Sequence, residues 1–286
     1  MRYLILNADD CGYCPEETRA VFDLMANGLI TSTSLLCVAE DSKSAVKKAA
    51  VTKAPCGIHL AVTADSTQHR WKPLSAAGTF SDEKGLFVSG DRRILLASRK
   101  EIRAELEAQY TWITEHGCRP DHADVHSTAL YGLAGRRFYL DVFDFCAAHN
   151  LPFRFPRRLH FLQEQLGGKD IPAAIRLLAA GVRLEAEARH LLLPDDLSTN
   201  PWNVERIGSL ENLRRYYLHE LEICGEGVTE MFLHPAYPAE GRGPEWRKRV
   251  WEREILESGC LIEKAKKLDI QLISWGGVCA DAARVS

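Results

Sequence analysis

The sequence predicts an α/β fold, in which parallel strands alternate with helices and form one barrel domain over residues 1–286. Two observations favour this fold. From the N-terminus onward, apolar runs of strand length alternate with segments of helical spacing, and this alternation is typical of β/α units in a parallel sheet. A chain of 286 residues also has a size at which single α/β barrels commonly occur. Two smaller domains are the alternative.

The expected elements follow from the spacing of apolar residues and from glycine and proline stops. Strands are expected at residues 3–6, 34–38, 56–62, 151–155, 228–233 and 270–275, with a further strand ending near residues 121–126. Helices are expected at residues 15–28, 41–51, 100–116, 136–150, 209–224 and 245–267. Residues 157–189 have a helical pattern of ambiguous topology, and residues 193–201 have the composition of a loop.

Residues 63–90 form the longest expected connection. They are rich in glycine, serine, aspartate, lysine and proline, and they exceed the usual length of a connection in a compact domain. Because loops of this length are often functional, we interpret the segment as a lid or wall over a site.

Composition limits the classes of partner and compartment. The chain is 46% hydrophobic and 26% charged, with a formal net charge of −3, which is not basic enough for a nucleic-acid surface. We find neither a signal peptide nor an apolar run of membrane-spanning length. Nine cysteines at irregular spacing indicate mostly reduced thiols. We therefore expect a cytoplasmic protein that binds neither nucleic acid nor membrane.

Two adjacent carboxylates follow the first expected strand. Residues 3–6 lead into Asp9 and Asp10, and Gly12 closes the turn after them. Ionised neighbours repel one another, so an unmatched pair at the end of a buried strand is costly, and a bound cation or a shared proton is the usual remedy. This pair is the first candidate for a functional site.

Histidines stand at the carboxyl ends of later strands. His59, His234 and the His122/Asp124/His126 cluster all have this position, and such ends converge on one face of a parallel barrel. The members of the cluster alternate along a strand, so their side chains should project to the same side. They are candidate metal ligands or residues that orient ligands. A lone strand histidine such as His59 is more often an ordinary core residue.

A Cys-x-x-Cys pair, Cys11 and Cys14, lies beside the aspartates. Such a pair can bind zinc or carry out redox chemistry, but zinc usually requires a second pair, which the chain lacks. We therefore interpret these two thiols as structural.

Five motifs occur in the order found in a known family: Asn7-Ala8-Asp9-Asp10-x-Gly12, Asn27-Gly28-Leu29-Ile30-Thr31-Ser32-Thr33-Ser34, Gly57-Ile58-His59-Leu60, His122-x-Asp124-x-His126 and His234-Pro235-x-Tyr237. In this the sequence resembles the YdjC-like carbohydrate deacetylases, which include chitooligosaccharide deacetylases. The resemblance spans nearly the whole chain. It implies a distorted, TIM-like β/α barrel of the kind used by glycoside hydrolases and deacetylases.

The resemblance also implies a division of roles. Asp10, His59 and His126 would bind a divalent metal, Asp9 would act as the general base and His234 as the general acid. The substrate would be an N-acetylated amino sugar, and the protein would form a homodimer. Two imidazoles and one carboxylate suit Zn²⁺, whereas Mg²⁺, often assigned in the family, prefers oxygen ligands.

Secondary roles and alternatives stay open. His122 or Asp124 could orient a ligand imidazole, and Arg154, at the end of an expected strand, could pair with Asp9. The chain departs from its relatives at residues 127–131, where histidines are common, and at Cys11, where an aromatic residue is common. The alternatives are a metal-dependent phosphoesterase on a similar barrel and a non-catalytic sugar-binding relative.

Overall fold

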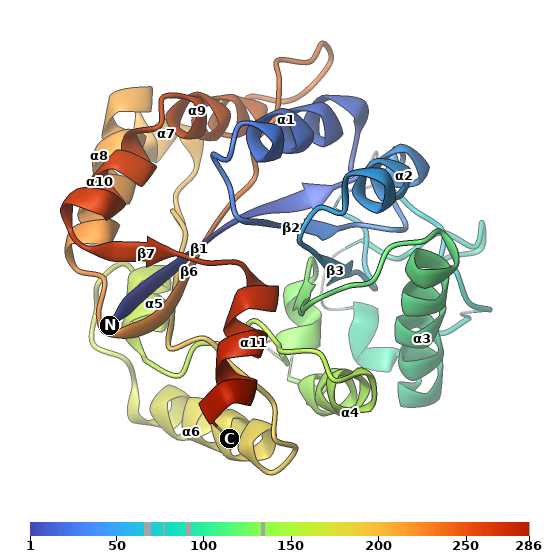
Figure 1. The fold of residues 1–286 in the computed structure, drawn as a ribbon. Coiled ribbons are helices and arrows are strands. Elements are labelled where there is room, and N and C mark those ends of the chain that lie inside the picture. The colour runs from blue at the N-terminus through green and yellow to red at the C-terminus, as the bar shows by residue number, and fades with distance from the viewer. Residues whose placement is uncertain (66–69, 77, 90–92, 133–134, 286) are drawn as a thin grey trace.

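A computed structural model describes the chain except residues 66–69, 77, 90–92, 133–134 and 286. A seven-stranded sheet curls into a half-barrel, and helices pack around its outside (Figure 1). The strand order is β4-β3-β2-β1-β6-β5, and β7 pairs with β1. Every paired strand is parallel within the described residues, so the predicted fold class is confirmed.

The strands are short except at the centre of the sheet. They are β1 (Arg2–Cys11), β2 (Ser32–Leu35), β3 (Cys56–Leu60), β4 (Ala123–Val125), β5 (Asp196–Ser198), β6 (Gly227–Leu233) and β7 (Ile270–Leu272). In β1, Leu4, Ile5 and Leu6 are fully buried, because the strand has neighbours on both edges and helices or loops on both faces.

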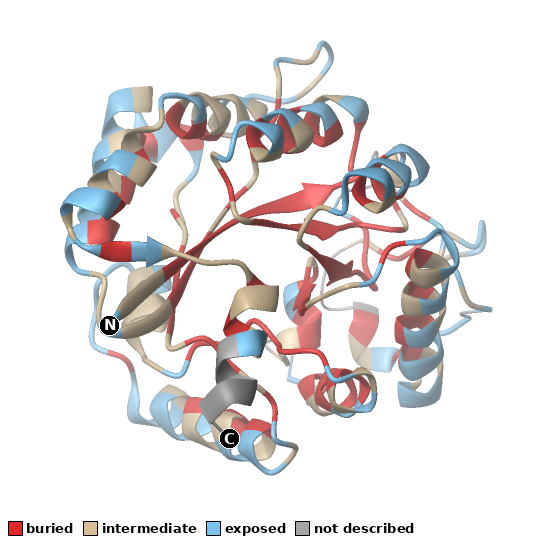
Figure 2. Ribbon diagram, viewed as in Figure 1, coloured by how far each residue is buried: buried red, intermediate tan, exposed pale blue. Residues whose placement is uncertain are grey.

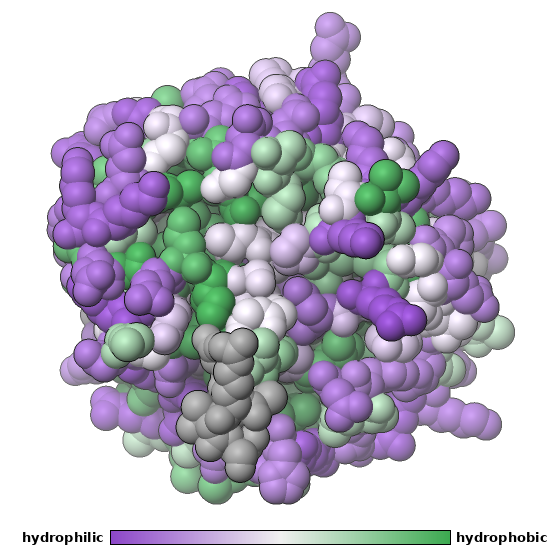
Figure 3. Space-filling model, viewed as in Figure 1, coloured by the Kyte–Doolittle hydropathy of each residue, from purple (hydrophilic) through white to green (hydrophobic). Residues whose placement is uncertain are grey.

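The helices surround the sheet, and their buried sides face it while their exposed sides face outward (Figure 2). They are α1 (Pro15–Ala26), α2 (Ser42–Thr52), α3 (Arg99–Glu115), α4 (Tyr139–His149), α5 (His160–Gln165), α6 (Ala173–Glu187), α7 (Val204–Ile207), α8 (Leu210–Glu222), α9 (Trp246–Glu257), α10 (Cys260–Lys267) and α11 (Trp275–Val285). Short 3₁₀ turns lie at Arg93–Leu96 and Thr128–Tyr131. On the face seen in Figure 3, hydrophilic side chains surround a central region in which more hydrophobic side chains gather.

The expectation of a single helix at residues 245–267 is wrong. The structure has α9 and α10 there, and Gly259 separates them with a positive φ of 70°. A left-handed glycine commonly ends a helix because it lacks the Cβ that makes this conformation costly. The other predicted helices are confirmed: α1, α4 and α8 are two to four residues shorter than expected, and α2 and α3 have the expected length but are shifted by one residue.

Two expectations between α4 and α7 are also wrong. Residues 151–155 do not form a strand, since Pro152 lacks an amide hydrogen and Phe153 makes only an isolated bridge to Ala123. The expected loop at residues 193–201 contains the short strand β5. The ambiguous residues 157–189 hold α5 and α6.

These irregular segments fill the gap between the two edge strands, β4 and β5. Phe153 contacts β4 through Ala123, and its amide donates to the carbonyl of Leu192 at 3.0 Å. The amide of Asp195 then donates to Val228 at the start of β6 at 2.8 Å. Main-chain hydrogen bonds therefore continue around the barrel without a regular ladder, which leaves room for a pocket.

One large apolar cluster extends from Leu4 in β1 to Ile270 in β7. It supports the expectation of a single domain over residues 1–286, which stays a prediction. Within the described residues, the structure contains no helix of sufficient length and apolarity to cross a membrane.

Candidate metal centre and active-site pocket

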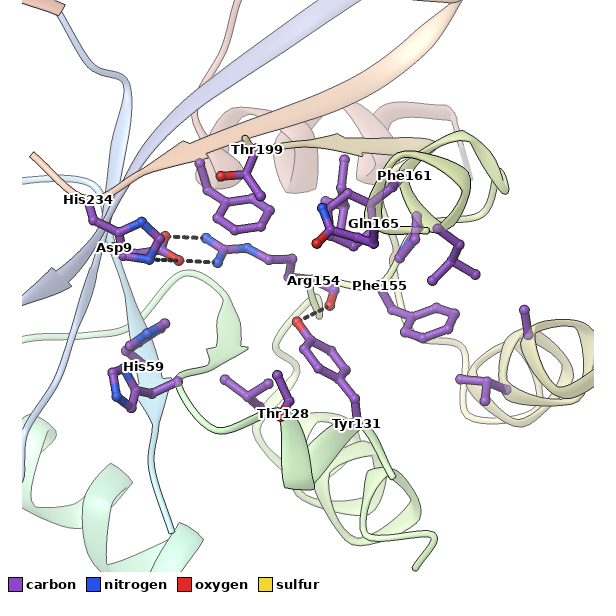
Figure 4. A pocket seen from close by; sticks show the side chains of 18 of the residues that line it. Asp9, His59, Thr128, Tyr131, Arg154, Phe155, Phe161, Gln165, Thr199 and His234 are labelled. Atoms are coloured by element: carbon purple, nitrogen blue, oxygen red, sulfur yellow. Dashed lines mark hydrogen bonds and ion pairs between the residues drawn. The ribbon is translucent and has the colours of Figure 1, made fainter. Parts of the chain in front are cut away.

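A cavity of about 500 Å³ opens at the carboxyl ends of the strands. Five of the predicted site residues line its polar end, namely Asp9, Asp10, His59, His126 and His234, and Arg154 lies beside them. Figure 4 shows Asp9, His59 and His234 close together, with Arg154 between them and the aromatic residues of the opposite wall. The strands thus bring together residues that are more than two hundred positions apart in the sequence.

A backbone irregularity lets both aspartates face this cavity. Consecutive residues of a regular strand point to opposite sides, but the pairing of β1 with β2 shifts register between Ala8 and Cys11. Asp10 also has a left-handed backbone, with φ at 61°. Gly12 follows with φ at 103°, where a Cβ would lie 3.1 Å from the carbonyl oxygen of Leu36. The turn after β1 therefore requires glycine and orients the pair.

Asp10, His59 and His126 form the candidate metal centre. Oδ1 of Asp10 lies 3.1 Å from Nε2 of His59 and 2.8 Å from Nδ1 of His126, and the donor atoms of the three residues lie within 4.8 Å of one another. Two imidazoles and a carboxylate that converge in this way fit a divalent cation with positions left open for other ligands.

The electrostatics of the cluster also favour a cation. Burial opposes ionisation of Asp10, but the charges of His126 and Arg249 hold the pKa of its carboxyl well below the ordinary range. Burial likewise opposes protonation of His126, yet the neighbouring Asp10 raises the pKa of His126 to about 9. The site attracts protons onto its imidazoles because it is rich in negative charge, and a metal cation would meet the same attraction.

Each candidate imidazole ligand has a carboxylate on its other nitrogen. Oδ1 of Asp124 lies 2.6 Å from Nδ1 of His59, and Oδ1 of Asp65 lies 2.5 Å from Nε2 of His126. Metal-binding histidines usually have such a partner, which fixes the ring orientation and the tautomer. Sequence reasoning named Asp124 but missed Asp65; the only available signal was that Asp65 lies in the segment 63–90, interpreted as a wall of the site.

Asp9 is held by Arg154. Two guanidinium nitrogens donate to its carboxylate oxygens at 2.6 and 2.8 Å, as Figure 4 shows, and the Asn7 amide donates at 2.8 Å. The same guanidinium contacts Asp124 at 2.6 Å and Glu230 at 2.8 Å. Arg154 therefore joins three buried carboxylates and fixes the orientation of Asp9. Glu230 was missed, although an acidic residue within the apolar strand β6 was a usable signal.

His234 lies on the other side of Asp9. Its Nε2 is 3.9 Å from Oδ2 of Asp9, and its Nδ1 is 3.9 Å from Glu252. The backbone amide of His234 donates to Glu252 at 2.7 Å. Burial lowers the pKa of His234 below its ordinary value, so its imidazole is neutral near pH 7 in the metal-free protein.

The three residues of the His122 cluster lie at successive depths. His126 lines the cavity, Asp124 lies beneath it, and His122 is deeper, with Nε2 4.0 Å from Asp124. The His122 ring stacks on Trp275, with centroids 5.1 Å apart, and its Nδ1 is 2.7 Å from Asp121. His122 is thus a buried packing residue outside the pocket lining.

Arg249 also lines the pocket and was not anticipated. It projects from α9, contacts Oδ2 of Asp10 at 2.9 Å and pairs with the buried Glu17 of α1. Within the segment 245–267, this arginine is one of several basic residues, so the sequence contained no signal that would have distinguished it. Cys11 and Cys14 are buried free thiols outside the pocket lining, and burial raises the pKa of both.

A parallel half-barrel with this Asp–His–His cluster at the carboxyl ends of its strands has the architecture of an α/β-barrel enzyme, whose active site lies at that end of the barrel. The chain belongs to the family of YdjC-like proteins, whose family model matches residues 3–267. The predicted family is therefore confirmed.

Individual relatives agree with this assignment. A carbohydrate deacetylase of Homo sapiens is 28% identical, with 87% of this chain and 81% of that protein covered. A carbohydrate deacetylase of Clostridium beijerinckii is 31% identical, but the match spans 53% of this chain and 59% of the relative. A crystal structure from Enterococcus faecalis, described for cellobiose-phosphate cleavage, has a TM-score of 0.76 at 22% identity and covers 97% of this chain and 98% of its own; it supports the fold alone.

Proposed function

We propose that the protein is a metal-dependent hydrolase that removes the acetyl group from an N-acetylated amino sugar. The observation that carries the proposal is the convergence of Asp10, His59 and His126 in the pocket, with their donor atoms within 4.8 Å, next to Asp9 and His234. The names of the relatives, carbohydrate deacetylases, support the reaction. A cytoplasmic homodimer stays a prediction.

Asp10, His59 and His126 would hold the metal, and Zn²⁺ or another first-row ion suits two imidazoles and a carboxylate better than Mg²⁺ does. A divalent ion there would polarise the acetyl carbonyl and lower the pKa of a water molecule. Asp124 and Asp65 would keep the two imidazoles in position through their second nitrogens.

Asp9 is suited to accept the proton of the attacking water. Arg154 and Asn7 bind its carboxylate in one orientation, so the group does not have to reorganise during the reaction. Asp9 is not among the three proposed ligands, and this leaves it able to gain and lose a proton.

His234 is suited to protonate the departing amine. Burial keeps the imidazole neutral before the reaction, so it needs a proton from within the site. Asp9 lies 3.9 Å away, close enough for the proton that it removes from water to reach the leaving group through His234 with a small movement.

Two substitutions test the assignment together. Asp10→Ala should lose the metal, whereas Asp9→Asn should keep the metal and lose about 10²–10⁴-fold in turnover, the typical contribution of a general base. Acetate release from N-acetylglucosamine oligosaccharides and metal content by elemental analysis are the measurements. Equal metal loss in both variants would contradict the division of roles. Failure of the metal-loaded wild type to release acetate from a broad panel of N-acetylated sugars would overturn the function.

The two alternatives make different predictions. A phosphoesterase of this kind uses two metals, but Arg154 already lies among Asp9, Asp124 and Glu230, where a second cation would otherwise be held. We therefore expect about one metal per chain. A non-catalytic relative would bind sugar equally well with and without a chelator, and without turnover.

A further inference from the structure

The pocket has a second, apolar arm that extends away from the metal centre. It runs from Phe232 of β6 past Phe155 to the helices α5 and α6, and its walls include Phe161, Leu178, Val182 and Leu197. Figure 4 shows Phe155 and Phe161 on the far side of Arg154 from Asp9. The polar centre occupies only one end of the cavity.

Polar side chains are a minority in the arm, where Gln165 and Thr199 lie beside the aromatic rings (Figure 4). The guanidinium of Arg154 is bound by three carboxylates, and the hydroxyl of Tyr131 donates to the Arg154 carbonyl at 3.0 Å. A sugar ring carries several hydroxyl groups, and each one that is buried without a partner costs free energy. A further sugar residue would therefore meet mainly apolar walls, whereas an apolar group would fit them.

The helix α6 presents unusually exposed leucines near this arm. Leu178 lines the pocket and is 49% exposed, and its neighbour Leu177 is 76% exposed. Gly167 and Gly168, both with positive φ, lie between α5 and α6. Large apolar side chains that are exposed at the edge of a cavity are typical of a binding surface that a ligand covers.

We propose that this arm binds a bulky apolar substituent carried by the amino sugar, so that the substrate is an amphiphilic amide and not a plain oligosaccharide. The inference rests on the proposed deacetylase function and specifies its substrate class. The polar centre would act on the amide while the arm removes the apolar group from water. Each buried methylene should strengthen binding by about fourfold at most.

The test compares three compounds: the methyl and hexyl β-glycosides of N-acetylglucosamine, and the methyl glycoside of N-hexanoylglucosamine. Amine release by the metal-loaded enzyme gives KM and kcat. We expect a KM at least about tenfold lower for one of the two hexyl-chain compounds than for the methyl glycoside of N-acetylglucosamine. Preference for the hexyl glycoside places the apolar group at the glycosidic position, and preference for the hexanoyl compound places it on the amide. Equal KM values for all three overturn the inference.

A matched pair of variants tests the arm itself. Leu178→Asn should raise KM for the preferred hexyl-chain compound about fivefold more than it raises KM for the methyl glycoside of N-acetylglucosamine, which has no alkyl chain to occupy the arm. Leu177→Asn, on the same helix but outside the pocket lining, should change neither. Because Leu178 is about half exposed, the substitution should leave the fold intact, which a thermal melt checks. An equal effect of Leu178→Asn on both substrates overturns the inference.

Calorimetric binding to chelator-treated protein separates this inference from the proposed function. The hexyl glycoside of glucosamine, which is the deacetylated product, should bind more tightly than the methyl glycoside of glucosamine. Leu178→Asn should remove this difference in affinity. If the hexyl glycoside binds more tightly but no substrate is turned over, the inference about the apolar arm is supported and the proposed deacetylase function is contradicted. Turnover without preference for an alkyl chain, in kinetics and in binding, supports the deacetylase and overturns the arm.

Discussion

Asp9 and Asp10 are adjacent in the chain but have different surroundings. Asp10 contacts two imidazoles and Arg249, whereas Asp9 contacts Arg154 and Asn7. The backbone irregularity after Ala8 sends the two carboxylates to different partners. The chemistry proposed for each aspartate therefore depends on its contacts, because the residue type is the same.

Removing the charge of Asp65 should weaken metal binding without unfolding the protein. Asp65→Asn removes the carboxylate that contacts Nε2 of His126, and loss of such an orienting partner typically costs 10–100-fold in metal affinity. Competition with a chelating dye measures this. The control is Asp82→Asn, in the same segment but paired with Arg70 at 2.8 Å, which should leave the affinity unchanged. Equal affinities for Asp65→Asn and the wild type would contradict the role.

His160 should make stability depend on pH. A hydrogen bond to Asp196 raises the pKa of His160. A raised folded-state pKa adds stability that is fully present below the ordinary value of about 6.5 and is lost as pH rises through the folded-state pKa. Urea unfolding should therefore show His160→Asn as less stable than the wild type at pH 5.5, with a smaller difference at pH 8.5. A difference that grows with pH would contradict this, and His219→Asn on the exposed side of α8 is the control.

At the scale of elements, the approach of β3 to β4 depends on one glycine. A Cβ on Gly57 would lie 2.4 Å from the ring of His122, which is itself packed on Trp275. Gly57→Ala should therefore destabilise the protein by about 1–3 kcal/mol, the usual cost of overpacking a core. Urea unfolding measures the loss.

A second glycine provides the control for this prediction. Gly181 lies within α6, and a Cβ there would meet nothing within 4 Å. Gly181→Ala should stabilise the protein by about 0.5–1 kcal/mol, since alanine is the better helix former. If both variants were neutral, the close contact between Gly57 and His122 would have no energetic consequence.

The elements that the sequence predicted well are those with strong periodicity. The helices α1, α2, α3, α4 and α8 and the strands β3 and β6 were all anticipated. For β1 the sequence located only residues 3–6 of a strand that runs from Arg2 to Cys11 and includes both aspartates. The strand β5 has three residues, too few for an alternation to be visible, and its pairing with β6 depends on distant residues. The prediction of a strand around Phe153 was wrong for a related reason. An apolar run next to a proline can occupy the position of a strand without forming a regular ladder of main-chain hydrogen bonds.

At the scale of the whole molecule, buried charge is concentrated at the carboxyl ends of the strands. Asp9, Asp10, Asp124 and Glu230 are all buried there, and the nearby guanidinium groups are those of Arg154 and Arg249. The carboxylates of Asp10 and Asp65 contact His126 and raise its pKa to about 9. A divalent cation would replace imidazole protons, so metal binding should release protons.

Metal binding should also stabilise the whole fold. A cation that binds only the folded state adds about 2.7 kcal/mol at a concentration 100 times its Kd, which corresponds to about 4–5 °C in Tm for a chain of this length. Thermal melts with and without Zn²⁺ after chelation measure the shift. Asp10→Ala should show no shift, and an equal shift in that variant would place the stabilising ion elsewhere.

The sequence by itself determined the fold class, the family and the residue types of the site. Apolar spacing is a local property of the chain, and Asp9, Asp10, His59, His126 and His234 belong to ordered motifs that can be read without coordinates. Only the tertiary structure decided which groups touch. Asp65, Glu230 and Arg249 join the site from a loop, a strand and a helix, and α5 and α6 give the pocket its apolar arm. The physical reason is that contacts between distant segments depend on how elements pack, and no local pattern records that packing.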